Sequence, residues 1–389
     1  MIQIINKAEC SGCQACRLAC PRQCITMVRD EEGFLYPCVD ESQCIQCGLC
    51  ERVCQSIHPI ESADLSKAYA AYSLNKDIQE KSSSGGIFTL LAEAILEKGG
   101  VVFGAAYDVS FEVRHVYVRT KEDLGRLRGS KYVQSNIGTS YRDAENFLKN
   151  GVPVLFTGTP CQIDGLLHYL RKPYSQLYTQ DVICHGVPSP MVWKQYIKEI
   201  ETLHDAKISS VSLKYKVPNW KNYSVKFTFD NGEESTELMG ENLYMRGFLL
   251  NLYLRPSCYS CHSKGMIRNS DITLADFWGV EQTASDMFNE KGTSLIIVHT
   301  ERGESLLDEI LPQLHIKNVN FQEAIMSNSS YFKSSECPEQ RGAVLSELKN
   351  NGFSVKYLAY IKKMQGNFLI NIGRQINRKL RQVFNRNRK

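Results

Sequence analysis

The chain has 389 residues, 43% of them hydrophobic and 23% charged, an ordinary globular composition with length for about two or three domains. This composition excludes wholesale disorder and a small disulfide-stapled scaffold. The net charge of +4 comes from the C-terminal end, because residues 356–389 carry ten Lys and Arg and no acidic residue, whereas the first 355 residues have 36 basic against 42 acidic side chains. The basic body of a nucleic-acid-binding enzyme is therefore absent, and we expect no nucleic acid among the partners.

The fifteen cysteines point to metal or redox chemistry. The first residues, MIQIINKAEC, lack the basic and apolar regions of a signal peptide, and no uncharged apolar run reaches the about 18 residues of a membrane span. We therefore expect a cytoplasmic protein, in which thiols stay reduced and dense cysteines usually bind metal. Ten of the fifteen lie between Cys10 and Cys54, which predicts a separate N-terminal domain.

This N-terminal region has the cysteine spacing of a bacterial ferredoxin with two clusters. The pattern C-x2-C-x2-C-x3-C occurs twice, the first time followed by Pro21. Each run supplies three thiolates to one 4Fe-4S cluster and its last cysteine to the other. The predicted ligands are Cys10, Cys13, Cys16 and Cys54 for one cluster, and Cys44, Cys47, Cys50 and Cys20 for the other.

Three residues of this region fall outside the pattern. Cys24 and Cys38 are surplus and are interpreted as small buried thiols. Gln55 replaces the second proline, which leaves the path of the chain beyond Cys54 open. Zinc is the alternative to iron because it also uses CxxC pairs, but two consecutive runs at this regular pitch favour iron–sulfur clusters.

Beyond Cys54 the sequence predicts a connector and then an α/β domain. Residues 55–74 show no strong period. Helical spacing predicts a helix over 86–98, and alternating strands and helices after it indicate a mostly parallel sheet. A hairpin over 208–230 makes this domain mixed α/β. The expected organisation is an α+β ferredoxin-like 4Fe-4S domain at 1–57, a linker at 58–80, a mixed α/β domain at 81–335 and a basic C-terminal helical tail at 336–389.

The predicted elements of the second domain follow one another closely. After the helix over 86–98 come strands in VVFGAAY and RHVYVRT, a helix in AENFLKNG, the strand VPVLF, a helix in QIDGLLHYL and the strand YTQDVIC. Two cysteines, Cys161 and Cys184, follow the last two strands. If those strands are parallel neighbours, their carboxyl ends share one edge of the sheet.

Cys258 and Cys261, which form a CxxC, would then complete a site of four thiolates with Cys161 and Cys184. The alternative is that Cys161 and Cys184 are buried thiols, and that the CxxC is half of a zinc site or no site.

Five sequence blocks, in order, carry a resemblance to a known family. They read KSSSGGIFTLLAEAIL, LRGSKYVQS, LFTGTPCQIDGLL, DVICHGVPSP and CYSCHSKGMIRNSDITLADFWG, and with the ferredoxin unit they span about the first 280 residues. The chain resembles the family of the coenzyme F-420 hydrogenase/dehydrogenase beta subunit. This resemblance implies that residues 81–335 form a flavin-binding and iron–sulfur oxidoreductase domain. It would hold FAD and a third 4Fe-4S cluster at Cys161, Cys184, Cys258 and Cys261, and would exchange electrons with a deazaflavin coenzyme or another two-electron partner.

The resemblance also implies which residues would hold the flavin. The serines before the predicted helix suit a phosphate, because hydroxyls and N–H groups meet there at the positive end of a helix dipole. The alternative is an ordinary N-cap with a glycine turn. Lys131 would place a positive charge near the flavin, unless it is a solvated loop lysine. The candidates are Ser83, Ser84, Gly85, Gly86, Arg128, Ser130, Lys131, Tyr132, Thr157, Gly158 and Thr159.

Electron counting joins these parts into one function. Iron–sulfur clusters carry one electron each and a deazaflavin accepts two, so a flavin is needed to store the first. We expect an oxidoreductase that passes electrons between ferredoxin-type clusters and FAD, with a redox partner protein or subunit and a two-electron substrate. No catalytic side chain is predicted. The alternatives are a non-catalytic relay subunit of a larger complex and a membrane-associated accessory protein with structural clusters.

The last residues show a basic amphipathic pattern. Apolar residues recur at helical steps between Phe368 and Phe384, with arginines on other faces. Such a helix suits contact with an anionic membrane surface, and the alternative is a C-terminal helix packed on its own domain. The expected location is therefore the cytoplasm, with the membrane surface as an open alternative.

Overall fold

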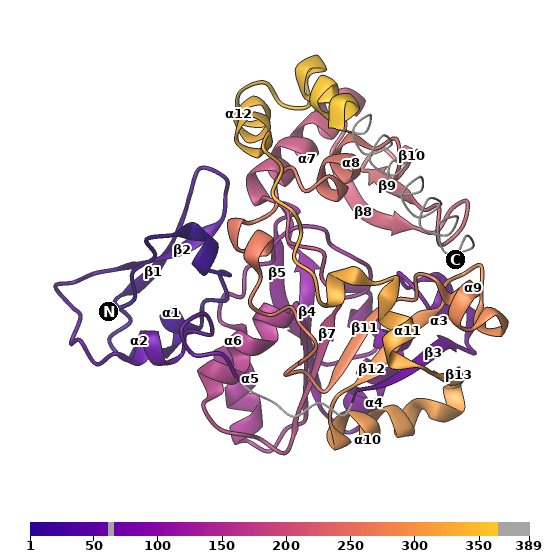
Figure 1. Ribbon diagram of the computed structural model, residues 1–389, viewed down its shortest axis with the longest axis horizontal. Coiled ribbons are helices and arrows are strands. Elements are labelled where there is room, and N and C mark those ends of the chain that lie inside the picture. The colour runs from indigo at the N-terminus through magenta and orange to yellow at the C-terminus, as the bar shows by residue number, and fades with distance from the viewer. Residues whose placement is uncertain (61–65, 365–389) are drawn as a thin grey trace, which may run out of the picture.

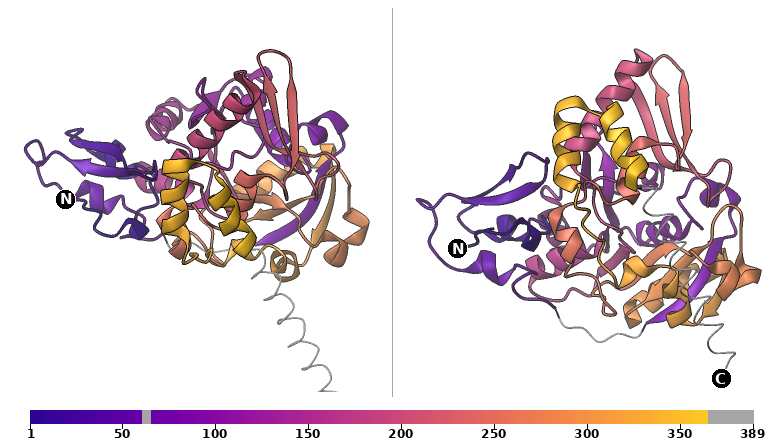
Figure 2. Two further views of the ribbon diagram at one scale, coloured as in Figure 1. Left: turned by 90° about the horizontal axis from the view of Figure 1, so that it is seen from above. Right: turned by 45° about the horizontal axis from the view of Figure 1, so that its top comes forward.

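The computed structural model describes residues 1–60 and 66–364 and shows a small N-terminal unit beside a larger α/β body (Figure 1). The small unit pairs β1 (Ile25–Arg29) with β2 (Leu35–Val39) antiparallel and adds the short helices α1 (Ala15–Ala19) and α2 (Leu49–Arg52). It stands out from the body in all the views (Figure 2). This is the ferredoxin-like arrangement expected from the cysteine spacing.

The body is built on an eight-stranded sheet with the order β13-β3-β12-β11-β7-β6-β4-β5. Only β4, β6, β7 and β11 pair parallel with one another. The remaining pairs are antiparallel, so the sheet is mixed and the prediction of a mostly parallel sheet was wrong. One reason is that β5 follows β4 with no helix between them, and strands joined in this way pair antiparallel. The strands are β3 (Lys67–Ser73), β4 (Val101–Tyr107), β5 (Val113–Val118), β6 (Val154–Gly158), β7 (Leu177–Val182), β11 (Ile272–Asp276), β12 (Ser294–Val298) and β13 (Leu314–Val319).

The predicted linker at 58–80 contains an interior strand. β3 lies between β12 and β13, and Ala68, Ala70 and Ala71 on it are buried. The sequence KAYAAYS hid this strand because alanine has little strand preference and gives no strong alternation. The linker prediction was therefore wrong at its C-terminal end, where α3 (Lys76–Glu80) also lies.

Helices cover both faces of the sheet. On one face α4 (Ile87–Glu97) and α10 (Glu301–Ile310) pack on strand residues such as Val102 and Leu155. On the other, α5 (Ser140–Lys149) and α6 (Pro160–Leu170) pack on the neighbouring strand residues, which point the opposite way because side chains alternate along a strand. Shorter helices are α9 (Val280–Thr283) and α11 (Phe321–Met326).

A second layer lies above this sheet in Figure 1. The strands β8 (Ile208–Tyr215), β9 (Ser224–Phe229) and β10 (Glu234–Leu238) form an antiparallel sheet, which confirms the hairpin expected over 208–230. An apolar core joins it to the surrounding helices. These are α7 (Pro190–His204), α8 (Leu243–Leu249) and α12 (Arg341–Asn351).

The predicted C-terminal tail begins inside this core. Tyr357 and Ile361, on the helix that follows α12, are fully buried among α7 and α8. The structure therefore packs residues 341–361 on the body, and the amphipathic helix predicted between Phe368 and Phe384 lies outside the described residues. In the described ranges no helix combines the length and the apolar character that crossing a membrane requires.

Candidate functional site

The eight predicted ferredoxin ligands line two separate pockets. Cys10, Cys13, Cys16 and Cys54 line one of them. Cys20, Cys44, Cys47 and Cys50 line the other, together with Cys24. The last cysteine of each run thus faces the first three of the other run, as the crossed pattern predicts.

The donor set of the Cys10 pocket fits the positively charged iron–sulfide core of a cluster. Burial raises the pKa of the Cys13 thiol to about 11, and the negative charges of Cys10 and Cys54 add to this effect. Burial and its three neighbours likewise hold the pKa of Cys16 well above its usual value. Four sulfurs in one buried place favour a group that supplies positive charge, which iron ions do.

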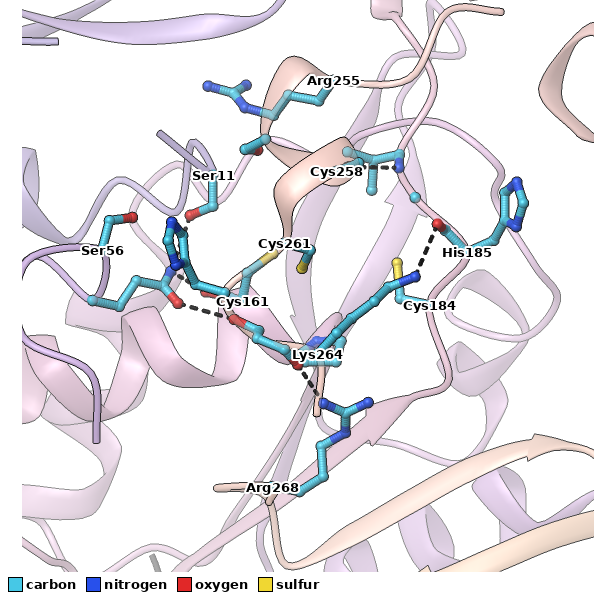
Figure 3. A pocket seen from close by; sticks show the side chains of 17 residues that line it. Ser11, Ser56, Cys161, Cys184, His185, Arg255, Cys258, Cys261, Lys264 and Arg268 are labelled. Atoms are coloured by element: carbon cyan, nitrogen blue, oxygen red, sulfur yellow. Dashed lines mark hydrogen bonds between the residues drawn. The ribbon is translucent and has the colours of Figure 1, made fainter. Parts of the chain in front are cut away.

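The four later cysteines line one further pocket, of about 600 Å³ including its open side. Cys161 lies in the first turn of α6, directly after β6, and Cys184 lies just beyond β7. Because β6 and β7 are parallel neighbours, both residues reach the same edge of the sheet. Cys258 and Cys261 come in from the loop around a 3-10 helix, η3 (Pro256–Ser260), and Figure 3 shows the four around one space.

This pocket also suits a metal cluster. Burial, together with the charges of neighbouring cysteines, raises the pKa of Cys184 to about 12 and that of Cys258 to about 11. Lys264 and Arg268 also line this pocket and bring basic side chains to it. Lys264 is held there because its Nζ donates to the carbonyls of His185, at 3.3 Å, and Lys333, at 2.9 Å.

The pocket of Cys161 adjoins the ferredoxin unit. Ser11, Gln55 and Ser56 line both this pocket and the Cys10 pocket. Gln55 is buried, and its Nε2 donates to the Cys161 carbonyl at 2.7 Å and to the Ser11 Oγ at 3.0 Å. Gln55, which replaces the second proline of the ferredoxin pattern, therefore connects its chain neighbour Cys54 to Cys161.

Two of the predicted flavin segments meet. Ser130 donates to the Ser83 Oγ from its backbone N at 2.9 Å, and the two hydroxyls lie 3.0 Å apart. Lys131 Nζ donates to the carbonyls of Arg126, at 3.0 Å, and Arg128, at 2.7 Å, and burial lowers the pKa of Lys131 to about 7. The structure thus joins the serine loop before α4 to the 128–131 segment through a hydroxyl pair, while the amine of Lys131 is tied to the carbonyls of its own segment.

The other residues of these segments have structural partners. Ser84 Oγ donates to the Thr293 carbonyl at 3.1 Å, and Gly85 N donates to the Ser294 Oγ at 2.9 Å, so both fix the loop to β12. Gly86 caps α4 with φ at 95°, a conformation that favours glycine. The Tyr132 ring packs 5.0 Å from that of Phe248.

The turn Thr157–Thr159 leads into Cys161 and has no hydrogen bond to the Ser83–Ser130 pair in the described chain. Thr159 Oγ1 is 3.2 Å from the Cys161 Sγ, and Thr159 caps α6 with Gln162. The Thr157 hydroxyl donates to the Phe103 carbonyl at 2.8 Å. Gly158 is packed against Gln162.

Sequence reasoning missed several basic residues of the site. Lys216 Nζ donates to the carbonyls of Gln79, Ser84 and Lys291 and so holds the serine loop in place. Arg255 lines the pocket of Cys161 and is 1% exposed. Its position three residues before Cys258 is the only sequence signal for it, and that signal is weak.

His115 supports the Thr157 turn and is expected to make the fold sensitive to acid. Its Nε2 is 2.9 Å from the Thr157 carbonyl, its Nδ1 is 2.8 Å from the Ser135 Oγ, and burial lowers its pKa to about 4. The unfolded histidine takes up a proton near pH 6.5, whereas the folded one does not until about pH 4. Its contribution to the free energy of unfolding therefore falls as the pH drops through this window, by about 2 kcal/mol between about pH 8 and about pH 5.

Denaturant unfolding of the wild type and of His115→Gln across this pH range tests the prediction. The variant should show a shallower loss of stability below about pH 6.5, because glutamine does not titrate. Equal slopes for the two proteins would contradict it.

Comparison with known families gives three matches. Two models describe the coenzyme F420 hydrogenase/dehydrogenase beta subunit, and the one for its N-terminal part matches residues 68–140, whereas the one for its C terminus matches residues 152–323. A 4Fe-4S dicluster domain matches residues 9–56. The three matches cover the ferredoxin unit, the serine loop and the later cysteines.

Individual relatives are more distant. Coenzyme F420-dependent sulfite reductase of Methanocaldococcus jannaschii is 24% identical over 327 residues, which is 79% of this chain and 47% of that protein. One of the subunits of the F(420)H(2) dehydrogenase of Methanosarcina mazei is 25% identical over 170 residues, 41% of this chain and 48% of that protein. The chain spans about half the length of these two relatives.

One solved structure is also similar. A chain of the F420-reducing NiFe hydrogenase complex from Methanosarcina barkeri aligns with a TM-score of 0.47 and 18% sequence identity. The alignment covers 69% of this chain and 93% of that chain.

Proposed function

The chain belongs to the family of the coenzyme F420 hydrogenase/dehydrogenase beta subunit, and from this premise we propose that it is an iron–sulfur flavoprotein oxidoreductase. It would pass electrons between 4Fe-4S clusters and FAD, and on to a deazaflavin coenzyme or another two-electron substrate. The observation that carries the proposal is the shared lining of two cysteine pockets by Ser11, Gln55 and Ser56. It brings the ferredoxin unit next to a second cysteine group in the same chain.

Each candidate group has a defined task in this proposal. When bound, the clusters supply one-electron carriers and FAD supplies the two-electron store between them and the substrate. The ligands would be the two crossed sets of the ferredoxin unit and the later set, Cys161, Cys184, Cys258 and Cys261. The Ser83–Ser130 pair and Lys131 would hold an anionic part of the flavin, since they offer hydroxyls and an amine whose protonated form a bound anion would stabilise.

The contacts of the chain itself favour transfer between the units. Gln55 holds the Cys161 carbonyl and the Ser11 hydroxyl, so it fixes the two cysteine groups relative to each other. An apolar core packs α1 against α6 beside this junction. An electron held at one group would therefore meet an ordered contact to the next.

A relay role is the second candidate. The chain spans about half the length of the two relatives, and one of them is named as part of a larger dehydrogenase. A chain of this kind could deliver electrons to a separate catalytic partner. Turnover of a deazaflavin by the isolated chain separates this role from that of a complete enzyme.

The proposal is tested by the cofactor content of anaerobically purified protein. We expect about twelve irons with matching acid-labile sulfide and about one FAD per chain, which corresponds to three 4Fe-4S clusters. Replacing Lys131 with methionine should lower the FAD content and leave the iron unchanged. About eight irons and no flavin in the wild type would overturn the proposal.

A further inference from the structure

Arg255 links the body of the protein to a loop of the ferredoxin unit. Its Nε donates to the Cys10 carbonyl at 2.7 Å, and its Nη2 donates to the Leu35 carbonyl at 2.9 Å. The same Nη2 lies 3.7 Å from the Cys10 Sγ. In Figure 3 the side chain extends toward the side of the pocket where Ser11 lies. The guanidinium therefore touches a predicted cluster ligand from outside the ferredoxin unit.

This guanidinium is buried with neutral partners. It is 1% exposed, and besides the contacts above it donates from Nη1 to the Gln134 Oε1 at 2.8 Å. Its Cζ lies 4.4 Å from the centre of the Tyr36 ring and 5.3 Å from that of Phe34. Among residues 1–60 and 66–364, no carboxylate forms an ion pair with Arg255.

A buried arginine without a carboxylate is costly, because burial removes the water that solvates its charge. Arg341, which also joins the body to the ferredoxin unit, shows the usual solution, since its guanidinium forms a two-armed ion pair with Glu32. Arg255 has Cys10 in the place of that carboxylate. An iron–sulfur cluster with four thiolate ligands carries a net negative charge and would supply the missing counter-charge.

The ferredoxin loop is shaped for this guanidinium. Gly12, between two predicted ligands, has φ at 73°, and a Cβ there would lie 2.7 Å from the Arg255 Nη1 and 2.8 Å from its Cζ. Any other residue would therefore push the guanidinium off the loop. The contact therefore needs both the Arg255 side chain of the body and a glycine at position 12 of the loop.

We propose that Arg255 is the counter-charge of the cluster predicted at Cys10, Cys13, Cys16 and Cys54, and that it raises the reduction potential of that cluster. This inference rests on the proposed function, because it requires the clusters to be present. Reduction adds one electron, and so one negative charge, without breaking a bond. A fixed positive charge beside the ligand stabilises the reduced form more than the oxidised form. Arg255 acts through Cys10 and is a positioning and tuning residue.

The test is a redox titration of anaerobic full-length protein, followed by the electron paramagnetic resonance of the reduced clusters. In Arg255→Gln the reduction potential of one cluster, followed through its resonance signal, should fall by at least about 59 mV. This fall corresponds to a tenfold change in the equilibrium constant of a one-electron reduction. Arg255→Lys keeps the positive charge but loses the planar guanidinium that donates to several acceptors at once, so the shift in potential should be smaller. The shift should persist when Cys161 is also replaced, because it belongs to the ferredoxin unit.

Arg341→Gln is the matched control, since it removes an ion pair between the same two units in which no cysteine takes part. It should leave all cluster potentials unchanged. Unchanged potentials in Arg255→Gln, or equal shifts in Arg255→Gln and Arg341→Gln, would overturn the inference. Equal loss of cluster iron from Arg255→Gln and Arg255→Lys would do the same, because the lysine keeps the counter-charge. Absence of 4Fe-4S signals in the wild type would instead contradict the proposed function itself.

Discussion

Replacing Cys161 with alanine is expected to remove about four of the about twelve irons that the proposal assigns to each chain, and to leave the ferredoxin clusters bound. Cys161 lines a pocket with three other cysteines, and alanine offers no ligand in place of its sulfur. Electron transfer from the ferredoxin unit to the flavin should slow by at least about a hundredfold, because the group between them is lost. Iron and sulfide analysis and stopped-flow flavin reduction measure the two effects.

Cys337→Ala is the control for this experiment. Cys337 is an exposed free thiol that does not line the pocket of Cys161. Its replacement should leave the iron content and the rate of flavin reduction unchanged. A Cys161→Ala protein that keeps the full iron content would show that the later cysteines do not hold a cluster.

Gly165→Ala is expected to weaken the contact between the ferredoxin unit and the body. Gly165 lies on α6, and a Cβ there would come within 2.7 Å of the Cys13 Cβ and 2.8 Å of the Tyr141 hydroxyl. Overpacking of this kind costs about 1–3 kcal/mol. The clash lies on Cys13, so iron should also be lost from the ferredoxin unit faster in the variant. Thermal unfolding and the rate of iron release to a chelator measure the two effects.

Gly342→Ala provides the opposite case on another helix. Gly342 lies on α12, and a Cβ there meets no atom. Alanine is better than glycine inside a helix by about 1 kcal/mol, so this variant should be neutral or more stable. Equal effects of the two substitutions would show that Gly165 is not needed for docking.

The predicted local elements were largely confirmed. The helix expected over 86–98 is α4 (Ile87–Glu97), and the strand VVFGAAY is β4 (Val101–Tyr107). These segments carry their own apolar periodicity, which decides their conformation over a few residues. β3 was missed, because its alanines become interior only when β12 and β13 pair on either side.

The candidate site also has one part that the sequence predicts and one part that depends on the fold. The spacing of Cys10 to Cys20 and of Cys44 to Cys54 carries its meaning within the sequence, because each run of ligands lies in one short loop. The later set depends on the sheet, since Cys161 and Cys184 approach only because β6 and β7 are parallel neighbours. Its assignment as a cluster site stays a prediction, as does the flavin site.

The sequence by itself determined the family, the ferredoxin unit and its spacing, and the main helices and strands of the body, because these depend on residues close together along the chain. Only the tertiary structure decided the direction of the outer strands and the neighbours of Gln55 and Arg255. Arg255 contacts Cys10 across 245 positions of sequence. Such contacts depend on how whole elements pack, and no local pattern of residues encodes them.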